Sequence, residues 1–236
     1  MSSDITAILI LAGLFTTCHR VNESPADENR IIFFGDSITE QGDQPGGYVS
    51  LLRDTLKSTA QTTHFEIIGA GIGGDRVPDL LDRVDRDVLD RLPTVVVVYI
   101  GINDVWHHAL FLRKGTPKDE FESGLRYLVG KMLKNGVRVM LCTPSVIGER
   151  HDGSNTLDIM LEEYSAISRS VAVELHVPLC DLRKSFVEFL KRNNQQNKEA
   201  GILTTDSVHL NDAGNRFVAT EILRVLKESN LIEFRQ

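Results

Sequence analysis

The sequence predicts one α/β domain in which helices cover both faces of a parallel sheet. Short apolar runs rich in β-branched residues recur five times, and longer amphipathic stretches alternate with them. The chain shows no internal repeat, and its 236 residues are enough for one large domain. Five strands are too few for an eight-stranded barrel, so a three-layer α/β/α architecture with a five-stranded parallel sheet is expected.

Five strands are expected where apolar residues of high β-propensity gather. Thr94–Ile100 has the sequence TVVVVYI, which is typical of a parallel strand buried on both faces. The five expected strands are Arg30–Phe34, His64–Ile68, Thr94–Ile100, Val137–Cys142 and Val177–Leu182.

Five helices are expected to alternate with these strands. Pro78 is compatible with a first helical turn, where no N–H donor is needed. Apolar residues then recur at helical spacing from Phe121 to Leu133, before an Asn135-Gly136 stop. The five expected helices are Gly47–Ser58, Pro78–Leu92, Lys118–Asn135, Leu157–Leu175 and Asp212–Lys227.

Composition excludes several classes of protein. Hydrophobic residues make up 42% and charged residues 25%, which is ordinary for a globular domain and excludes bulk disorder. The formal charge of −7 has no basic run to offset it, so nucleic acid is not an expected partner. Cys18, Cys142 and Cys180 are too few for a disulfide scaffold and lack zinc-site spacing. The sequence leaves Cys142 and Cys180 either free or oxidised, and it does not define an oligomeric state.

Residues 1–29 are expected to be separate from the domain at residues 30–236. The apolar run Ile5–Thr17 is too short to span a bilayer but has the length of a signal-peptide core, although no Lys or Arg precedes it. Thr16-Thr17-Cys18 partly resembles a bacterial lipid-attachment site. Export or tethering to a membrane is therefore favoured over a cytoplasmic location; the alternative is an additional apolar element packed on the domain.

Ligands of open α/β sheets bind beyond the carboxyl ends of the strands. A functional site is therefore expected among the segments that follow the predicted strands. Four of them are glycine-rich or polar: Gly35-Asp36-Ser37, Gly69–Asp75, Gly101–Asp104 and Thr143–Asn155.

Ser37 is a candidate nucleophile. A serine in a tight turn between strand and helix exposes its hydroxyl above the sheet, and its backbone N–H lies where developing negative charge is favoured. Thr39 takes the place of the last glycine of a Gly-x-Ser-x-Gly elbow. The alternative is that Ser37 only caps a helix.

Asp206 and His209 are candidates for the other two members of a triad. A carboxylate three residues before a histidine can bind one ring nitrogen, which leaves the other free to accept a proton. Two alternatives are an incidental histidine in a loop and a metal site. Loosely spaced further metal ligands would be His107, His108, His151 and Asp152.

Two segments could stabilise an oxyanion. Asn103 follows the most apolar strand and could donate its amide, although turn chemistry is an alternative role. Residues 69–74 match Gly-x-Gly-x-x-Gly, but the next strand lacks the terminal acidic residue that dinucleotide binding requires. The glycines instead allow a close backbone approach, with the N–H of Gly74 as a donor.

Together, these blocks resemble the GDSL or SGNH hydrolase family from about Ile31 to about Ala219. The first block reads Gly-Asp-Ser-Ile, with Ser37 in the nucleophile position. Gly74 and Asn103 match the oxyanion residues, and Asp206 and His209 match the Asp-x-x-His block. Two positions depart from the pattern: Gly69 and Leu210 stand where many members carry Asn and Pro.

The resemblance implies a flavodoxin-like SGNH hydrolase fold and a serine esterase that needs no metal or organic cofactor. Ser37, Asp206 and His209 would form the triad, and Ser37, Gly74 and Asn103 the oxyanion hole. Activity would rise as His209 loses its proton.

The sequence says less about the substrate. Asp36, Trp106 and His107 are expected to contact it, and the Pro144–Asn155 loop either lines the cleft or is a solvated surface loop. No long apolar segment resembles a lipase lid, so a short-chain acyl ester is expected, for instance on an acetylated carbohydrate. A thioesterase or lysophospholipase with the same residues is the alternative. Two less favoured alternatives are a non-catalytic binding module and a metal-dependent hydrolase.

Overall fold

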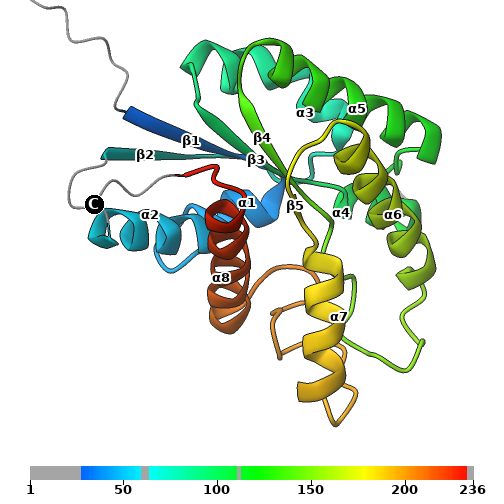
Figure 1. The fold of residues 1–236 in the computed structure, drawn as a ribbon. Coiled ribbons are helices and arrows are strands. Elements are labelled where there is room, and N and C mark those ends of the chain that lie inside the picture. Colours follow the sequence, from blue (N-terminus) through cyan, green and yellow to red (C-terminus); the bar gives the residue numbers. More distant parts are fainter. Residues whose placement is uncertain (1–27, 60–63, 111–112, 233–236) are drawn as a thin grey trace, which may run out of the picture.

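The centre of the molecule is a five-stranded parallel sheet in the order β2-β1-β3-β4-β5, seen in a computed structural model that describes residues 28–59, 64–110 and 113–232 (Figure 1). This is the flavodoxin-like strand order, and it confirms the predicted fold class. The strands are β1 (Glu28–Gly35), β2 (His64–Gly71), β3 (Val95–Tyr99), β4 (Arg138–Cys142) and β5 (Leu179–Cys180).

Helices cover both faces of the sheet. α3, α5 and α6 pack in sequence over one face, and α2 and α8 pack together over the other (Figure 1). The helices are α1 (Ser37–Gly42), α2 (Tyr48–Thr59), α3 (Val77–Asp87), α4 (Ile102–Trp106), α5 (Lys118–Lys134), α6 (Asp158–Glu174), α7 (Leu182–Asn193) and α8 (Asp212–Glu228), with 3₁₀ turns at Leu89–Arg91 and His107–Ala109.

The core is formed by the central strands and the helix faces against them. All five residues of β3 are buried, as the uninterrupted apolar run predicts. In β1, Ile31 to Phe34 are fully buried as well. The hydrophobic effect therefore fixes β1 and β3 most firmly, and the segments that leave their carboxyl ends start from a rigid base.

Several element boundaries differ from the sequence-based expectation. β2 continues past Ile68 to Gly71, because Gly71 pairs with Gly35 of β1. A methyl group on Gly71 would come within 2.1 Å of the backbone nitrogen of Glu40, so only glycine lets α1 pack this closely. The helix expected over Pro78–Leu92 ends at Asp87 and is followed by the 3₁₀ turn.

Three helices were not predicted. α1 and α4 have six and five residues, too few for a hydrophobic period to show. α7 is long enough, and its buried Leu182, Phe186 and Leu190 recur every four residues, so the sequence does contain a helical pattern there.

The strand cysteines are free. Cys142 of β4 and Cys180 of β5 are neighbours in the sheet register, and both are buried, as expected of small apolar residues. The predicted targeting segment and Cys18 lie outside the described residues. None of the helices within the described ranges is both long and apolar enough to cross a bilayer.

Candidate active site

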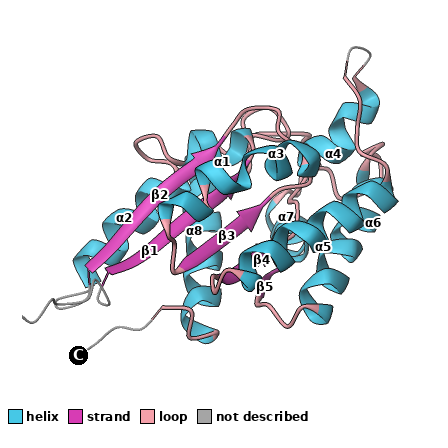
Figure 2. Cartoon of the chain, turned by 90° about the horizontal axis from the view of Figure 1, so that it is seen from above, coloured by secondary structure: helices cyan, strands magenta, loops and turns pink. Residues whose placement is uncertain are grey.

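β1 ends at the carboxyl edge of the sheet, close to α1 (Figure 2). Ser37 is the first residue of α1, two positions after the end of β1. Asp36 is the N-cap of α1, and its carboxylate accepts a hydrogen bond of 2.9 Å from the N–H of Ile38. The capping role considered for Ser37 thus belongs to its neighbour. Asp36 is 2% exposed and shapes the turn that presents Ser37, and its expected contact with substrate stays a prediction.

Ser37, His209 and Asp206 form a continuous hydrogen-bonded chain. Nε2 of His209 lies 3.0 Å from Oγ of Ser37, and Nδ1 of His209 lies 2.7 Å from Oδ2 of Asp206. Asp206 also accepts hydrogen bonds from the N–H groups of Val208 and His209, at 3.1 and 2.8 Å. Burial raises the pKa of Asp206, but these hydrogen bonds outweigh it and leave the pKa below its ordinary value. Asp206 is therefore ionised at neutral pH.

Gly74 and Asn103 supply potential oxyanion donors from the ends of β2 and β3. Gly74 has a φ of +84°, a conformation that favours glycine. The side chain of Asn103 is buried, and its Nδ2 donates to the carbonyl oxygen of Asp75 at 3.0 Å. An amide nitrogen carries two hydrogens, so this bond orients the group and leaves the second N–H available.

Arg83 fixes this edge of the sheet from below, a role that the sequence analysis missed. Its guanidinium donates to the carbonyl oxygens of Gly35 at 2.8 Å and Ala70 at 3.0 Å, and it binds the carboxylate of Asp75 at 2.7 Å. It also lies over the ring of Phe34, 4.5 Å from the centroid. Arg83 is only 5% exposed, so one buried cation joins the ends of β1 and β2 to the segment after Gly74.

Glu149 supports the loop that carries Asp206 and His209. It belongs to the Pro144–Asn155 loop, which was expected either to line the cleft or to be solvated, but its own side chain is fully buried. Its carboxylate accepts from the N–H groups of Ile202, Leu203 and Thr204 at 2.8, 2.6 and 2.6 Å, and from the Thr204 hydroxyl at 2.9 Å. Thr204 in turn pairs with Leu210 across the base of the catalytic loop. Nothing beside it in the sequence, which continues with Arg150, His151 and Asp152, signals that Glu149 is buried.

Two hollows of similar size lie beside the candidate catalytic residues. One, of about 360 Å³, is lined by Trp106, Asp206, Ser207 and residues of the 147–157 loop. The Trp106 ring packs edge-on against the His209 ring, with centroids 6.3 Å apart. The other, of about 350 Å³, is lined by Gly74 and His107, among others. We call them the Trp106 hollow and the Gly74 hollow.

The loosely spaced metal candidates are held by separate interactions. The His107 ring contacts the guanidinium of Arg113. The His108 ring forms a hydrogen bond with the backbone carbonyl of Thr116, and the His151 ring forms one with the backbone carbonyl of Asn194. In the described ranges, no three His, Cys, Asp or Glu side chains are arranged to hold a metal ion.

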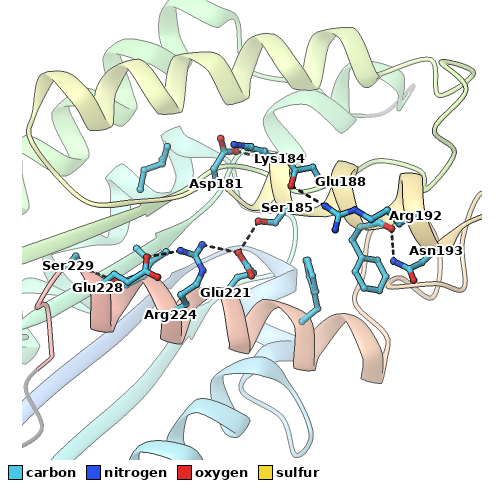
Figure 3. A pocket seen from close by; sticks show the side chains of 14 residues that line it. Asp181, Lys184, Ser185, Glu188, Arg192, Asn193, Glu221, Arg224, Glu228 and Ser229 are labelled. Carbon is cyan, nitrogen blue, oxygen red and sulfur yellow. Dashed lines mark hydrogen bonds and ion pairs between the residues drawn. The ribbon is translucent and has the colours of Figure 1, made fainter.

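A further hollow of about 630 Å³ lies between α7 and α8 (Figure 3). None of the catalytic candidates lines it. Its arginines are neutralised locally: Arg192 pairs with Glu188, and Arg224 pairs with Glu221 and Glu228.

Comparisons with known proteins find relatives over most of the chain. The model of the GDSL-like Lipase/Acylhydrolase family matches residues 33–217. An acetylxylan esterase of Geobacillus stearothermophilus is 30% identical over an alignment that covers 83% of this chain and 92% of the relative. The uncharacterized lipoprotein YqeF of Bacillus subtilis is 28% identical, with coverages of 80% and 85%.

Solved structures show the same relationship. The crystal structure of an acetyl xylan esterase is 47% identical, covers 83% of this chain and 98% of its own, and superimposes with a TM-score of 0.80. Structures of the Geobacillus enzyme include two catalytic mutants, in which a serine and a histidine are replaced by alanine.

The fold and the Ser37 site thus define a carboxylic ester hydrolase. This chain belongs to the GDSL-like lipase/acylhydrolase family, as the sequence resemblance predicted, and within that family its relatives support an acetyl ester hydrolase.

Proposed function

We propose that this protein is a serine acetylesterase that removes acetyl groups from carbohydrates. The observation that carries the proposal is the hydrogen-bonded chain from Oγ of Ser37 through His209 to Asp206. In it, His209 is placed to accept the serine proton, and Asp206 is placed to fix the ring tautomer and to stabilise its cation.

In the first half of the reaction, Oγ of Ser37 attacks the acetyl carbonyl while His209 takes its proton. The resulting oxyanion accepts hydrogen bonds from the N–H groups of Ser37 and Gly74 and from the second amide hydrogen of Asn103. When the tetrahedral intermediate collapses, His209 returns the proton to the leaving alcohol. Water then attacks the acetyl-enzyme with His209 again as base, which releases acetate and restores Ser37.

The leaving alcohol must lie on the His209 side, because that ring protonates it. The Trp106 hollow adjoins this side, since Trp106 packs on His209 and since Asp206 and Ser207 line the hollow. It combines aromatic and apolar surface with the polar side chains of Arg150 and Asn155, a mixture typical of small-molecule sites. We assign it to the sugar, with Trp106 as the substrate contact that the sequence suggested.

The acyl and sugar specificities rest on the relatives. The first relative is named an acetylxylan esterase, and one of its structures is described as that of an acetyl-xylooligosaccharide esterase. A more distant rat relative, 25% identical, is named an isoamyl acetate-hydrolyzing esterase homolog, which also acts on an acetyl ester by name. The lysophospholipase alternative would require long acyl chains, and the thioesterase alternative would require a thiol leaving group.

The test compares acetate release from acetylated xylo-oligosaccharides with hydrolysis of p-nitrophenyl acetate and p-nitrophenyl octanoate. We expect turnover of both acetyl esters, a higher kcat/KM for the oligosaccharide, and little turnover of the octanoate. Preference for octanoate would contradict the acetylesterase assignment, and turnover of p-nitrophenyl acetate alone would contradict the carbohydrate assignment.

We also propose that the protein is exported. The apolar run Ile5–Thr17 supports this, as does the name of the Bacillus subtilis lipoprotein. Cell fractionation followed by N-terminal sequencing tests it. Full-length protein found only in the cytoplasm would contradict it.

A further inference from the structure

The Gly74 hollow contains an unusual set of charges. It has a volume of about 350 Å³, within the range of small-molecule sites, and it shares no lining residue with the Trp106 hollow. Three cationic residues line it, Arg76, Arg113 and Lys114, and so do Asp75 and Asp79, whose carboxylates pair with Arg83 and Arg76. In a chain with a net charge of −7, three cations beside the active site call for an explanation.

Arg76 is neutralised within the protein. It binds both carboxylate oxygens of Asp79, at 3.0 and 3.3 Å, and donates to the carbonyl of Lys114 at 2.9 Å. The other two cations are different. Within the described part of the chain, neither Arg113 nor Lys114 lies within ion-pairing distance of a carboxylate, and both residues are exposed.

Arg113 is nevertheless held in a defined place. Its Nη1 lies 3.3 Å from Nε2 of His107, which is 5% exposed. Burial, together with the positive charges of Arg113 and Arg76, lowers the pKa of His107, so the ring is neutral and can accept this hydrogen bond. The guanidinium also lies directly against Gly74, because a methyl group on that glycine would come within 2.6 Å of Nη1.

The hollow between α7 and α8 offers a comparison, because its arginines do have acidic partners. There, Arg192 and Arg224 are paired with glutamates that line the same hollow (Figure 3). In the Gly74 hollow, by contrast, most N–H groups of the positioned Arg113 guanidinium have no partner among the described residues. A planar guanidinium with a neighbouring ammonium is well suited to a carboxylate.

We propose that the Gly74 hollow binds a carboxylate of the substrate, so that the preferred ester is an acetylated oligosaccharide carrying a uronic acid group. This inference rests on the proposed function, in which the N–H of Gly74 faces the acyl oxygen. Because Arg113 lies against Gly74, the carboxylate would sit close to the ester that is cleaved. Arg113 and Lys114 would then determine specificity without taking part in the chemical step.

The experiment uses two matched substrates. One is an acetylated xylo-oligosaccharide with a glucuronic acid side group, and the other is the same compound after its carboxyl group is reduced to an alcohol. For the wild type we expect kcat/KM to be about tenfold or more higher for the acidic substrate, which is the size of one charge-assisted hydrogen bond. The difference should appear mainly in KM and should shrink at high salt.

Arg113→Gln should bring the ratio of the two kcat/KM values close to one, and Arg113→Lys should retain part of it. Arg91→Gln is the matched control, because it removes an exposed arginine just before β3, at the opposite edge of the sheet. A wild-type ratio of one, or an unchanged ratio in Arg113→Gln, would overturn the carboxylate site alone. Failure of the wild type to hydrolyse either substrate would overturn the proposed function and the site together.

Discussion

At the scale of single residues, the active site depends on side chains whose charge is set by their surroundings. The hydrogen bonds that hold Asp206 ionised also hold its carboxylate against His209. The carboxylate therefore has two functions in the proposed mechanism: it selects the ring tautomer and it stabilises the imidazolium.

Asp206→Asn tests these functions. The amide nearly preserves the shape, but it loses the negative charge and can hold the ring in the wrong tautomer. We expect kcat on p-nitrophenyl acetate to fall on the order of 10³–10⁴-fold with little change in KM. A variant that kept more than a tenth of the wild-type kcat would contradict the assignment of Asp206.

Asp36 should make stability depend on pH. Burial raises the pKa of this carboxyl to about 7, from an ordinary value of 3.8. Between these two values the folded protein holds a proton that the unfolded chain releases. The contribution of Asp36 to the free energy of unfolding is therefore fully present below pH 3.8. It is lost as the pH rises from there through about 7.

Asp36→Asn removes this titration and can keep the helix cap, because asparagine is also a good N-cap residue. Its free energy of unfolding relative to wild type should increase with pH over this window, by on the order of 4 kcal/mol in total. Urea denaturation at a series of pH values measures the difference. A difference that stays constant from acidic to weakly basic pH would show that Asp36 does not titrate in this way.

At the scale of elements, the site is assembled from segments that leave neighbouring strand ends, and the Asp206–His209 loop is brought to them by Glu149. Four hydrogen bonds to this buried carboxylate fix the chain just before the loop. In addition, the N–H of Gly148 donates to the carbonyl of Ser207 within it, at 2.8 Å.

Glu149→Gln replaces one acceptor oxygen with an NH₂ group that faces backbone donors. We expect a loss of about 2 kcal/mol in stability, and a lower kcat with a nearly unchanged KM because the loop loses its position. Glu188→Gln, at a half-exposed position on α7, is the matched control. Equal kinetic constants for the two variants, measured well below their Tm values, would contradict the positioning role.

How far the sequence predicts these elements depends on their length and burial. β3 and α5 were placed within one or two residues, because a continuous apolar run and a long helical period are unambiguous signals. α1 and α4 were not predicted, although they carry Ser37 and Asn103. Their residues were still recognised, since the chemical identity of a motif does not depend on the element that contains it.

At the scale of the whole molecule, Arg83 shows what the sequence could not predict. A single arginine in an amphipathic helix is usually solvated, and nothing in its neighbours indicates that it will be buried under the strand ends. Its partners Gly35, Ala70 and Asp75 come from two other parts of the chain. Only the packing of α3 against the sheet brings them together.

Arg83→Met keeps much of the volume but leaves two carboxylates, those of Asp75 and Asp87, without their buried cation. We expect the free energy of unfolding to fall by about 3 kcal/mol or more. Arg86→Met is the control in the same helix, because Arg86 is exposed and solvent screens its pair with Asp87. Similar losses for the two variants in chemical denaturation would show that Arg83 has no special role.

The central claim is that Ser37 is the nucleophile and that His209 activates it. The most direct measurement is incubation with a serine-reactive phosphonate, followed by peptide mass spectrometry of wild type and His209→Ala. We predict one adduct per chain, located on Ser37, forming at least 10³-fold more slowly in the variant. An adduct on another serine, or equal labelling rates in the two proteins, would contradict the account.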